Sequence, residues 1–185
     1  MNDPNNTPIV VHPSPTSNNL QTSGDFSEEL VKKSTKMHIE DVQRGLGVVA
    51  SMLLNRGAWH DYTKLMHLEE FTKYLNAYKQ TGKFPESEGN WYNKYHLTER
   101  HHLDDGAPED VNLIDVLESI VDGVVSGMAR SGSYEVRPLP SELLAKAYVN
   151  TAKLIHSLVR VENTTTPEAA PSSATGFKFK VDPEP

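Results

Sequence analysis

Residues 111–128 read VNLIDVLESIVDGVVSGM, and the spacing of their apolar side chains decides the fold class. These side chains recur every three or four positions, which is the period of an α-helix and not of a strand. They are Val111, Ile114, Leu117, Val121, Val125 and Met128. The same period runs over residues 28–55, 62–81, 90–101 and 141–161, and we find no pattern that indicates a sheet. The sequence therefore predicts an all-α domain of about five main helices.

Helix-end signals place the boundaries of these segments. Gly57 is expected to stop the first helix, Gly82 to end the second, and Asn90 to cap the third. The domain should cover residues 26–162 of the 185-residue chain. Residues 1–25 and 163–185 are rich in Asn, Pro, Ser and Thr, so they should form disordered tails that cannot offset their ordering entropy.

One stretch of the second tail, residues 177–181, alternates apolar and basic side chains as FKFKV. Two interpretations stay open for it. It is either part of a flexible tail, or an extended segment that adds to a sheet edge or binds a partner.

Composition excludes several classes of function. The formal net charge of −7 argues against binding of extended nucleic acid. The chain has no Cys, which removes disulfides, thiolate metal sites and cysteine nucleophiles, so any metal must be held by nitrogen and oxygen. No signal peptide, membrane-spanning run or phosphate-binding glycine loop is present. We expect a cytoplasmic protein without a membrane partner.

Histidines and aspartates carry the chemical signal. Six of the 8 His lie between His38 and His102. His38 shares a helical face with apolar residues and should point inward, either as a ligand or as a core histidine with one hydrogen bond. A turn after Gly57 can direct His60 and Asp61 to one centre. Asp122 lies in an apolar stretch, where a buried carboxylate costs several kcal/mol unless a cation or several donors compensate it.

This ordered set resembles the H…HD…D signature of the HD-domain metal-dependent phosphohydrolase superfamily, an all-α group. The match is His38, then His60-Asp61, then Asp122. The stretches 60–64 (HDYTK) and 96–102 (HLTERHH) are also similar to small HD-like proteins of phages and bacteria. The resemblance covers roughly residues 36–130.

The resemblance implies two divalent-ion sites. His38, His60, Asp61 and Asp122 would hold the first ion; His96 and His101 would hold the second, with Asp61 bridging. One geometric problem stands against it: residues five apart on a straight helix point about 140° away from each other. A helix break near Arg100, or the use of His102 in place of His101, would solve this problem.

The expected activity is hydrolysis of a phosphoester in a small substrate such as a nucleotide, through a metal-activated hydroxide. One or two ions of Mn, Mg, Fe, Co or Zn would serve. Asp61 would orient the nucleophile, His102 would protonate the leaving oxygen, and Lys64 and Arg100 would contact phosphate. Otherwise Lys64 is an exposed helix lysine, and Arg100 pairs with the acidic residues 104–105. If the chain is phage-encoded, the compartment is the host cytoplasm.

Two other functions remain open at this point. Some HD-fold proteins with additional histidines hold two irons and activate oxygen. The site could also be a metal-stabilised module that binds a partner without catalysis. Homo-oligomer formation fits any of the three functions. On the later helix, Asp115 and Glu118 share a face with Asp122: they either orient histidine ligands or, for Asp115 above all, belong to a solvated acidic stripe.

Overall fold

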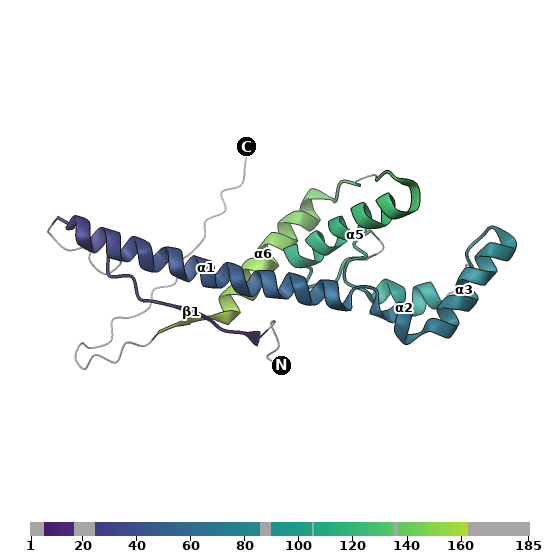
Figure 1. The fold of residues 1–185 in the computed structure, drawn as a ribbon, viewed down its shortest axis with the longest axis horizontal. Coiled ribbons are helices and arrows are strands. Elements are labelled where there is room, and N and C mark those ends of the chain that lie inside the picture. The colour runs from purple at the N-terminus through teal and green to yellow at the C-terminus, as the bar shows by residue number, and fades with distance from the viewer. Residues whose placement is uncertain (1–5, 17–24, 86–89, 105, 135–136, 163–185) are drawn as a thin grey trace.

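The computed structural model describes residues 6–16, 25–85, 90–104, 106–134 and 137–162. Three long helices dominate it: α1 (Glu28–Trp59), α5 (Leu113–Ser131) and α6 (Ser141–Leu158). Helices α5 and α6 pack against each other, α5 lies beside α1, α6 crosses α1 in this view, and the N-terminal half of α1 extends beyond them (Figure 1). The predicted all-α class is confirmed. No described helix is long and apolar enough to cross a bilayer.

Helix α1 begins at a conventional cap and ends later than predicted. The Ser27 side chain accepts a hydrogen bond from the backbone N–H of Leu30, and two glutamates occupy the first turn. The predicted stop at Gly57 is wrong, because Gly57 is an ordinary helical residue inside α1. A glycine weakens a helix by about 1 kcal/mol but ends it only where the backbone turns left-handed.

The second predicted helix is divided in two. Helix α2 (Tyr62–Met66) and helix α3 (Leu68–Thr81) meet at His67, whose backbone leaves the helical region at φ −120° and ψ 44°. The His67 ring stacks on Tyr95, with 3.6 Å between ring centroids. Helix α3 ends as expected at Gly82, where φ is 69°.

The third predicted helix is much shorter than expected. Asn90 caps it as predicted, accepting a hydrogen bond from the Asn93 N–H at 2.8 Å. However, α4 covers only Trp91–Lys94, and a short 3₁₀ turn, η3, follows at His96–Thr98. None of the described residues between Thr98 and Asn112, the cap of α5, is helical.

A two-stranded parallel sheet corrects the expectation that the chain contains none. Strand β1 (Ile9–Val11) pairs with β2 (Val159–Val161), Ile9 opposite Val159. The last helix accordingly ends at Leu158 and not at Val161. Each strand is only three residues long, too short to show a period, and its partner is about 150 positions away.

The same pairing corrects the predicted N-terminal boundary. Ile9 is 3% exposed and belongs to a core cluster with Met52, Ile114 and Leu158. Residues 6–16 are therefore part of the structured domain, although they fall in the predicted tail. The remaining tail predictions, including the alternating stretch 177–181, lie outside the described residues.

A second core cluster fixes the non-helical connection between η3 and α5. Leu103 in this connection packs with Val111, with Val116 of α5 and with Ala147 of α6. All four side chains are buried. The cluster thereby holds the neighbouring pair His101-His102 against the side of α5.

Candidate metal centre

His60 and Asp61 form the turn that ends α1. Asp61 has φ 57° and ψ 18°, and it is the one non-glycine residue with positive φ in the described part of the chain. Aspartate tolerates this left-handed conformation better than most residues. The turn directs both side chains toward α5 and toward the connection after α4, as the HD pair was expected to do.

His96 and His101 face the Asp61 carboxylate from this connection. Asp61 Oδ1 lies 3.6 Å from His96 Nδ1 and 3.8 Å from His101 Nε2. Both histidines are buried, and none of these three atoms has a hydrogen-bond partner among the described residues. Buried polar atoms without a partner are rare because each costs roughly 1–3 kcal/mol. A cation among the three atoms would remove this cost.

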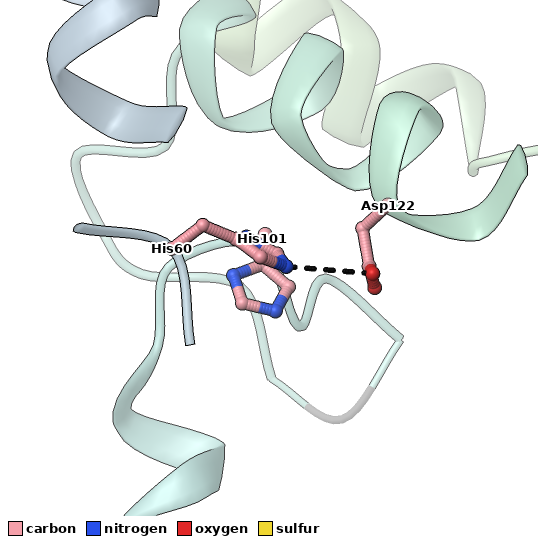
Figure 2. Close-up of side chains that lie close together, drawn as sticks. All are labelled: His60, His101 and Asp122. Atoms are coloured by element: carbon pink, nitrogen blue, oxygen red, sulfur yellow. Dashed lines mark ion pairs between the residues drawn. The ribbon is translucent and has the colours of Figure 1, made fainter. Parts of the chain in front are cut away.

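Helix α5 supplies the other side of the centre. Asp122 Oδ1 lies 3.4 Å from His60 Nε2, and His101 lies beside the same pair (Figure 2). Glu118, one turn earlier on α5, has Oε1 at 3.0 Å from His60 Nδ1. The Glu118 carboxylate thus holds the His60 ring so that its second nitrogen faces Asp122.

Within the described ranges of the chain, two sets of donor atoms have the spacing of a metal site. The first is His60, His101 and Asp122; the second is Asp61, His101 and His102. Within each set the donor atoms lie within 4.8 Å of one another. His101 belongs to both sets. The expected conflict between positions five apart does not arise, because the chain is not helical between Thr98 and His101.

His38 does not join this centre, and the expectation that it points inward is wrong. It is exposed. It also lies 22 positions before His60, the C-cap of the same uninterrupted helix, so the two residues are on the order of 33 Å apart along α1. The ligand set that the resemblance implied needs His38 beside His60, and one straight helix between them does not allow this.

Arg100 is an anchor for a buried carboxylate, so its predicted contact with phosphate is wrong. Its guanidinium makes two hydrogen bonds to Asp115, at 2.7 and 2.8 Å, and a third to Asp110 at 2.8 Å. Arg56 reaches Asp115 at 3.0 Å. Asp115 is 0% exposed, so the solvated acidic stripe is wrong as well. The hydrogen bonds that Arg100 donates to Asp115 raise the pKa of Arg100, which stays charged.

Lys64 is part of the centre. Its ammonium group pairs with Asp61 Oδ2, so the interpretation as an exposed helix lysine is wrong. Burial alone would raise the pKa of the Asp61 carboxyl, but the hydrogen bond and charge of Lys64 lower it below its ordinary value. Asp61 is therefore a carboxylate at neutral pH, with Oδ1 directed to the histidines and Oδ2 to the lysine.

The histidines have opposite electrostatic environments. Burial acts against protonation of His60, yet Glu118, Asp61 and Asp122 together raise its pKa above 6.5. Burial, with the nearby His102 and Lys64, lowers the pKa of His96 to about 3. His96 is thus neutral at pH 7, which is the form that binds a metal ion.

Aromatic residues wall this region. Trp91 is 5% exposed and lies nearly parallel to the His96 ring, with 5.0 Å between centroids, so it packs in the core. Trp59 is exposed and contacts Tyr62 edge to face.

Arg137 is a candidate functional residue that the sequence did not indicate. It lines a cavity of about 250 Å³ with His101, His102 and Asp122. Its side chain is 80% exposed and lies 3.9 Å from Asp104, so its charge remains accessible. Nothing in the sequence marks this arginine, since it follows α5 in a connection with no motif.

Comparison with known proteins gave no match to a protein-family model, to a curated protein or to a solved structure. The similarity to HD-domain proteins therefore depends on the residue pattern of this chain alone.

Proposed function

We propose that this chain is a divalent-metal-dependent phosphohydrolase that acts on a nucleotide or a related small phosphoester. The observation that carries the proposal is the position of Asp61 Oδ1. This atom is buried between the nitrogens of His96 and His101, at 3.6 and 3.8 Å, without a hydrogen-bond partner in the described chain. A carboxylate so placed suits two neighbouring ions, one toward His60 and Asp122 and one toward the later histidines.

The donor types fit this proposal. Imidazole nitrogen with carboxylate oxygen suits Mn, Fe, Co and Zn more than Mg, whose ligands are mostly oxygen. Glu118 beside His60 has the role expected of a carboxylate that orients a metal-bound histidine. Ions bound here would lower the pKa of a coordinated water so that hydroxide forms near neutral pH.

The protein residues would supply orientation and charge. Lys64 stands beside Asp61 and offers a cation to phosphoryl oxygens. Arg137 offers a second cation from the wall of the 250 Å³ cavity, in the role first expected for Arg100. His102 lines the same cavity and can give a proton to the leaving oxygen.

A second candidate function is a di-iron oxygenase. It is favoured by the gathering of four imidazoles, those of His60, His96, His101 and His102, within one centre. Visible absorption distinguishes the two candidates: the iron-loaded oxygenase would be coloured and consume O₂, whereas a hydrolase would release phosphate or a phosphate-containing product without O₂.

The deciding experiment combines metal analysis with a substrate screen. The purified chain should bind one or two ions, measured by elemental analysis and calorimetry, and hydrolyse a member of a panel of nucleotides and phosphodiesters with Mn²⁺, Mg²⁺, Fe²⁺ or Co²⁺. Asp61→Asn, which keeps a residue tolerant of positive φ but removes the charge, should abolish tight binding. The exposed His156→Gln is the control. Unchanged metal content in Asp61→Asn would overturn the site.

A further inference from the structure

A continuous apolar stripe on α1 is exposed. Val31, Ile39, Val42 and Leu46 are between 45% and 63% exposed, although they recur at helical spacing on one face. His38 lies on this face, between Val31 and Val42. An apolar stripe of this length normally packs against another element, and no element of the described chain covers it.

The N-terminal segment does not cover the stripe. Residues 12–16 do run along α1, where His12 contacts Asp41 and the hydroxyls of residues 14 and 16 contact Ser34. Asp41 and Ser34 lie on the neighbouring face of the helix. Around the helix axis, Asp41 is about 100° from Val42 and Ser34 is about 80° from it. The stripe itself thus remains open beside this segment.

A groove continues the stripe toward the metal centre. It is a cavity of about 460 Å³ between the C-terminal half of α1 and the outer face of α5. Its walls are mostly apolar, and its polar end carries His60 and Asp122. The apolar residues that line it are Leu53, Leu117, Val121 and Val125.

The stripe and the groove lie on opposite sides of Val49 along α1, an arrangement that suits a second copy. His38 and His60 are each 11 positions from Val49, about 16 Å along the helix, and they point within about 40° of each other. If two copies of α1 cross antiparallel at Val49, His38 of each copy comes opposite His60 of the other. The same arrangement lays Ile39 and Val42 of one copy along the groove of the other.

We propose that the chain is a homodimer whose two α1 helices pack antiparallel about Val49, and that the partner's His38 completes the metal centre at His60 and Asp122. This inference rests on the proposed metal centre and adds a ligand to it. One straight helix cannot bring His38 back to His60 of the same chain. In the dimer, His38 of the other subunit takes the place of the upstream histidine in the H…HD…D order.

The available area agrees with a dimer. Seven side chains of the stripe and groove are roughly half exposed, and together they offer on the order of 500 Å² of apolar surface per copy. They are Val31, Ile39, Val42, Leu46, Leu117, Val121 and Val125. A standard interface buries about 800 Å² per partner, of which about 65% is apolar in homodimers. A twofold interface also requires a self-complementary surface, and in this arrangement the stripe of each copy faces the groove of the other.

The first test is the oligomeric state of the full chain, measured by sedimentation velocity. The wild type should sediment as a dimer. Leu46→Glu places a charge in the stripe and should give a monomer. Leu54→Glu is the matched control, since Leu54 is also an exposed α1 leucine but lies about 80° away from Leu46, off the stripe, and this variant should stay dimeric. A monomeric wild type, whether the stripe is covered by the chain's own tail or is bare, would overturn the proposal.

The second test asks whether His38 acts across the interface. His38→Ala should remain dimeric and bind Mn²⁺ at least about tenfold more weakly, whereas the exposed His156→Ala should bind as the wild type does. The partner's His38 is then tested by mixing. His38→Ala and His60→Ala, refolded together, should regain one high-affinity site per mixed dimer, because one centre then has both histidines.

These outcomes separate this inference from the proposed function. If the wild type binds no metal, the proposed function fails. If it binds metal as a dimer but mixing restores no site, or if His38→Ala binds Mn²⁺ normally, only the role of His38 is refuted. If Leu54→Glu and Leu46→Glu dissociate the dimer equally, the stripe is not the interface.

Discussion

Nδ1 of His60 lies 3.0 Å from Oε1 of Glu118, a contact that joins the end of α1 to α5 across 58 positions of sequence. It fixes the orientation of the His60 ring and leaves Nε2 directed to the metal centre. The carboxylate of Glu118 also faces His101, whose Nδ1 is 3.4 Å away. Burial alone would raise the pKa of the Glu118 carboxyl, but the two histidine rings lower it, so it remains charged.

Glu118→Gln should weaken metal binding while leaving the fold intact. The amide oxygen can still accept from His60, but the charge that orients the ring and raises its basicity is lost. We expect roughly 10- to 100-fold lower affinity for Mn²⁺ by calorimetry. Glu142→Gln, an exposed glutamate in the first turn of α6, is the control. Equal affinities in both variants would mean that the backbone alone orients His60.

Lys64→Ala should keep the fold and the metal but lose turnover of a phosphoester. Loss of a charge-assisted contact to a developing oxyanion costs on the order of 2–4 kcal/mol, or roughly 30- to 1000-fold in rate. Metal affinity should not fall, because the ammonium group competes with an ion for Asp61 Oδ2. Lys64→Arg should recover only part of the rate. Full activity of Lys64→Ala on an identified substrate would refute this role.

Without metal, the protein should lose stability as the pH falls from 6.5 toward 3 because of His96. The folded chain keeps this ring neutral down to about pH 3, whereas the unfolded chain takes up its proton below pH 6.5. The free energy of unfolding then decreases with a slope of at most about 1.4 kcal/mol per pH unit for this one proton. The raised pKa of His60 acts in the opposite direction: its contribution is present below pH 6.5 and is lost as the pH rises through its folded value.

Urea denaturation in EDTA, followed by the fluorescence of the buried Trp91, would measure this dependence. His96→Gln should flatten the acid side of the profile, since the titrating group is gone. The exposed His156→Gln should leave the slope as it is in the wild type. A wild-type slope that survives in His96→Gln would assign the acid sensitivity to other groups.

Arg100→Ala should lower the stability of the protein, whereas Arg137→Ala should lower its activity. Arg100→Ala leaves Asp115 buried with Arg56 as its remaining cation, so we expect a loss of roughly 3 kcal/mol in urea denaturation, at the lower end for a broken buried ion pair. Arg137→Ala removes an exposed side chain and should leave stability unchanged within about 0.5 kcal/mol. It should instead raise the KM or lower the kcat for a phosphoester. An unstable Arg137→Ala with normal activity would reverse this assignment.

Ile9→Ala should destabilise the domain, although Ile9 lies in the segment that the sequence predicts to be a disordered tail. Ile9 fills a core cluster with Met52, Ile114 and Leu158, so truncation should cost about 2–5 kcal/mol. Val10→Ala, next to it but 38% exposed, should cost much less. If the two variants unfold at the same urea concentration, β1 contributes little to the core and the domain begins at α1.

The sequence by itself determined the elements whose cause is local. Helical periodicity located α1, α3, α5 and α6, and the cap at Asn90 was correct because a cap depends on its own turn. The residue types of the centre were also readable from the sequence: the structure brings His60, Asp61, His96, His101, His102 and Asp122 together. The order and spacing of these residues in the sequence predicted that they meet. The position of His38 fitted the same order, but the structure places His38 far from the others.

Tertiary structure decided everything that depends on where distant segments meet. Arg100 pairs with Asp115, 15 positions away in sequence, because Asp115 is buried and needs a cation. The pairing of Ile9 with Val159 has no local signal, since a three-residue strand is stable only with its partner. His38 is separated from His60 because the energetic penalty of Gly57 is too small to interrupt α1. For Arg100 and for Ile9 the free energy comes from contacts between distant segments, which no local pattern of residues contains.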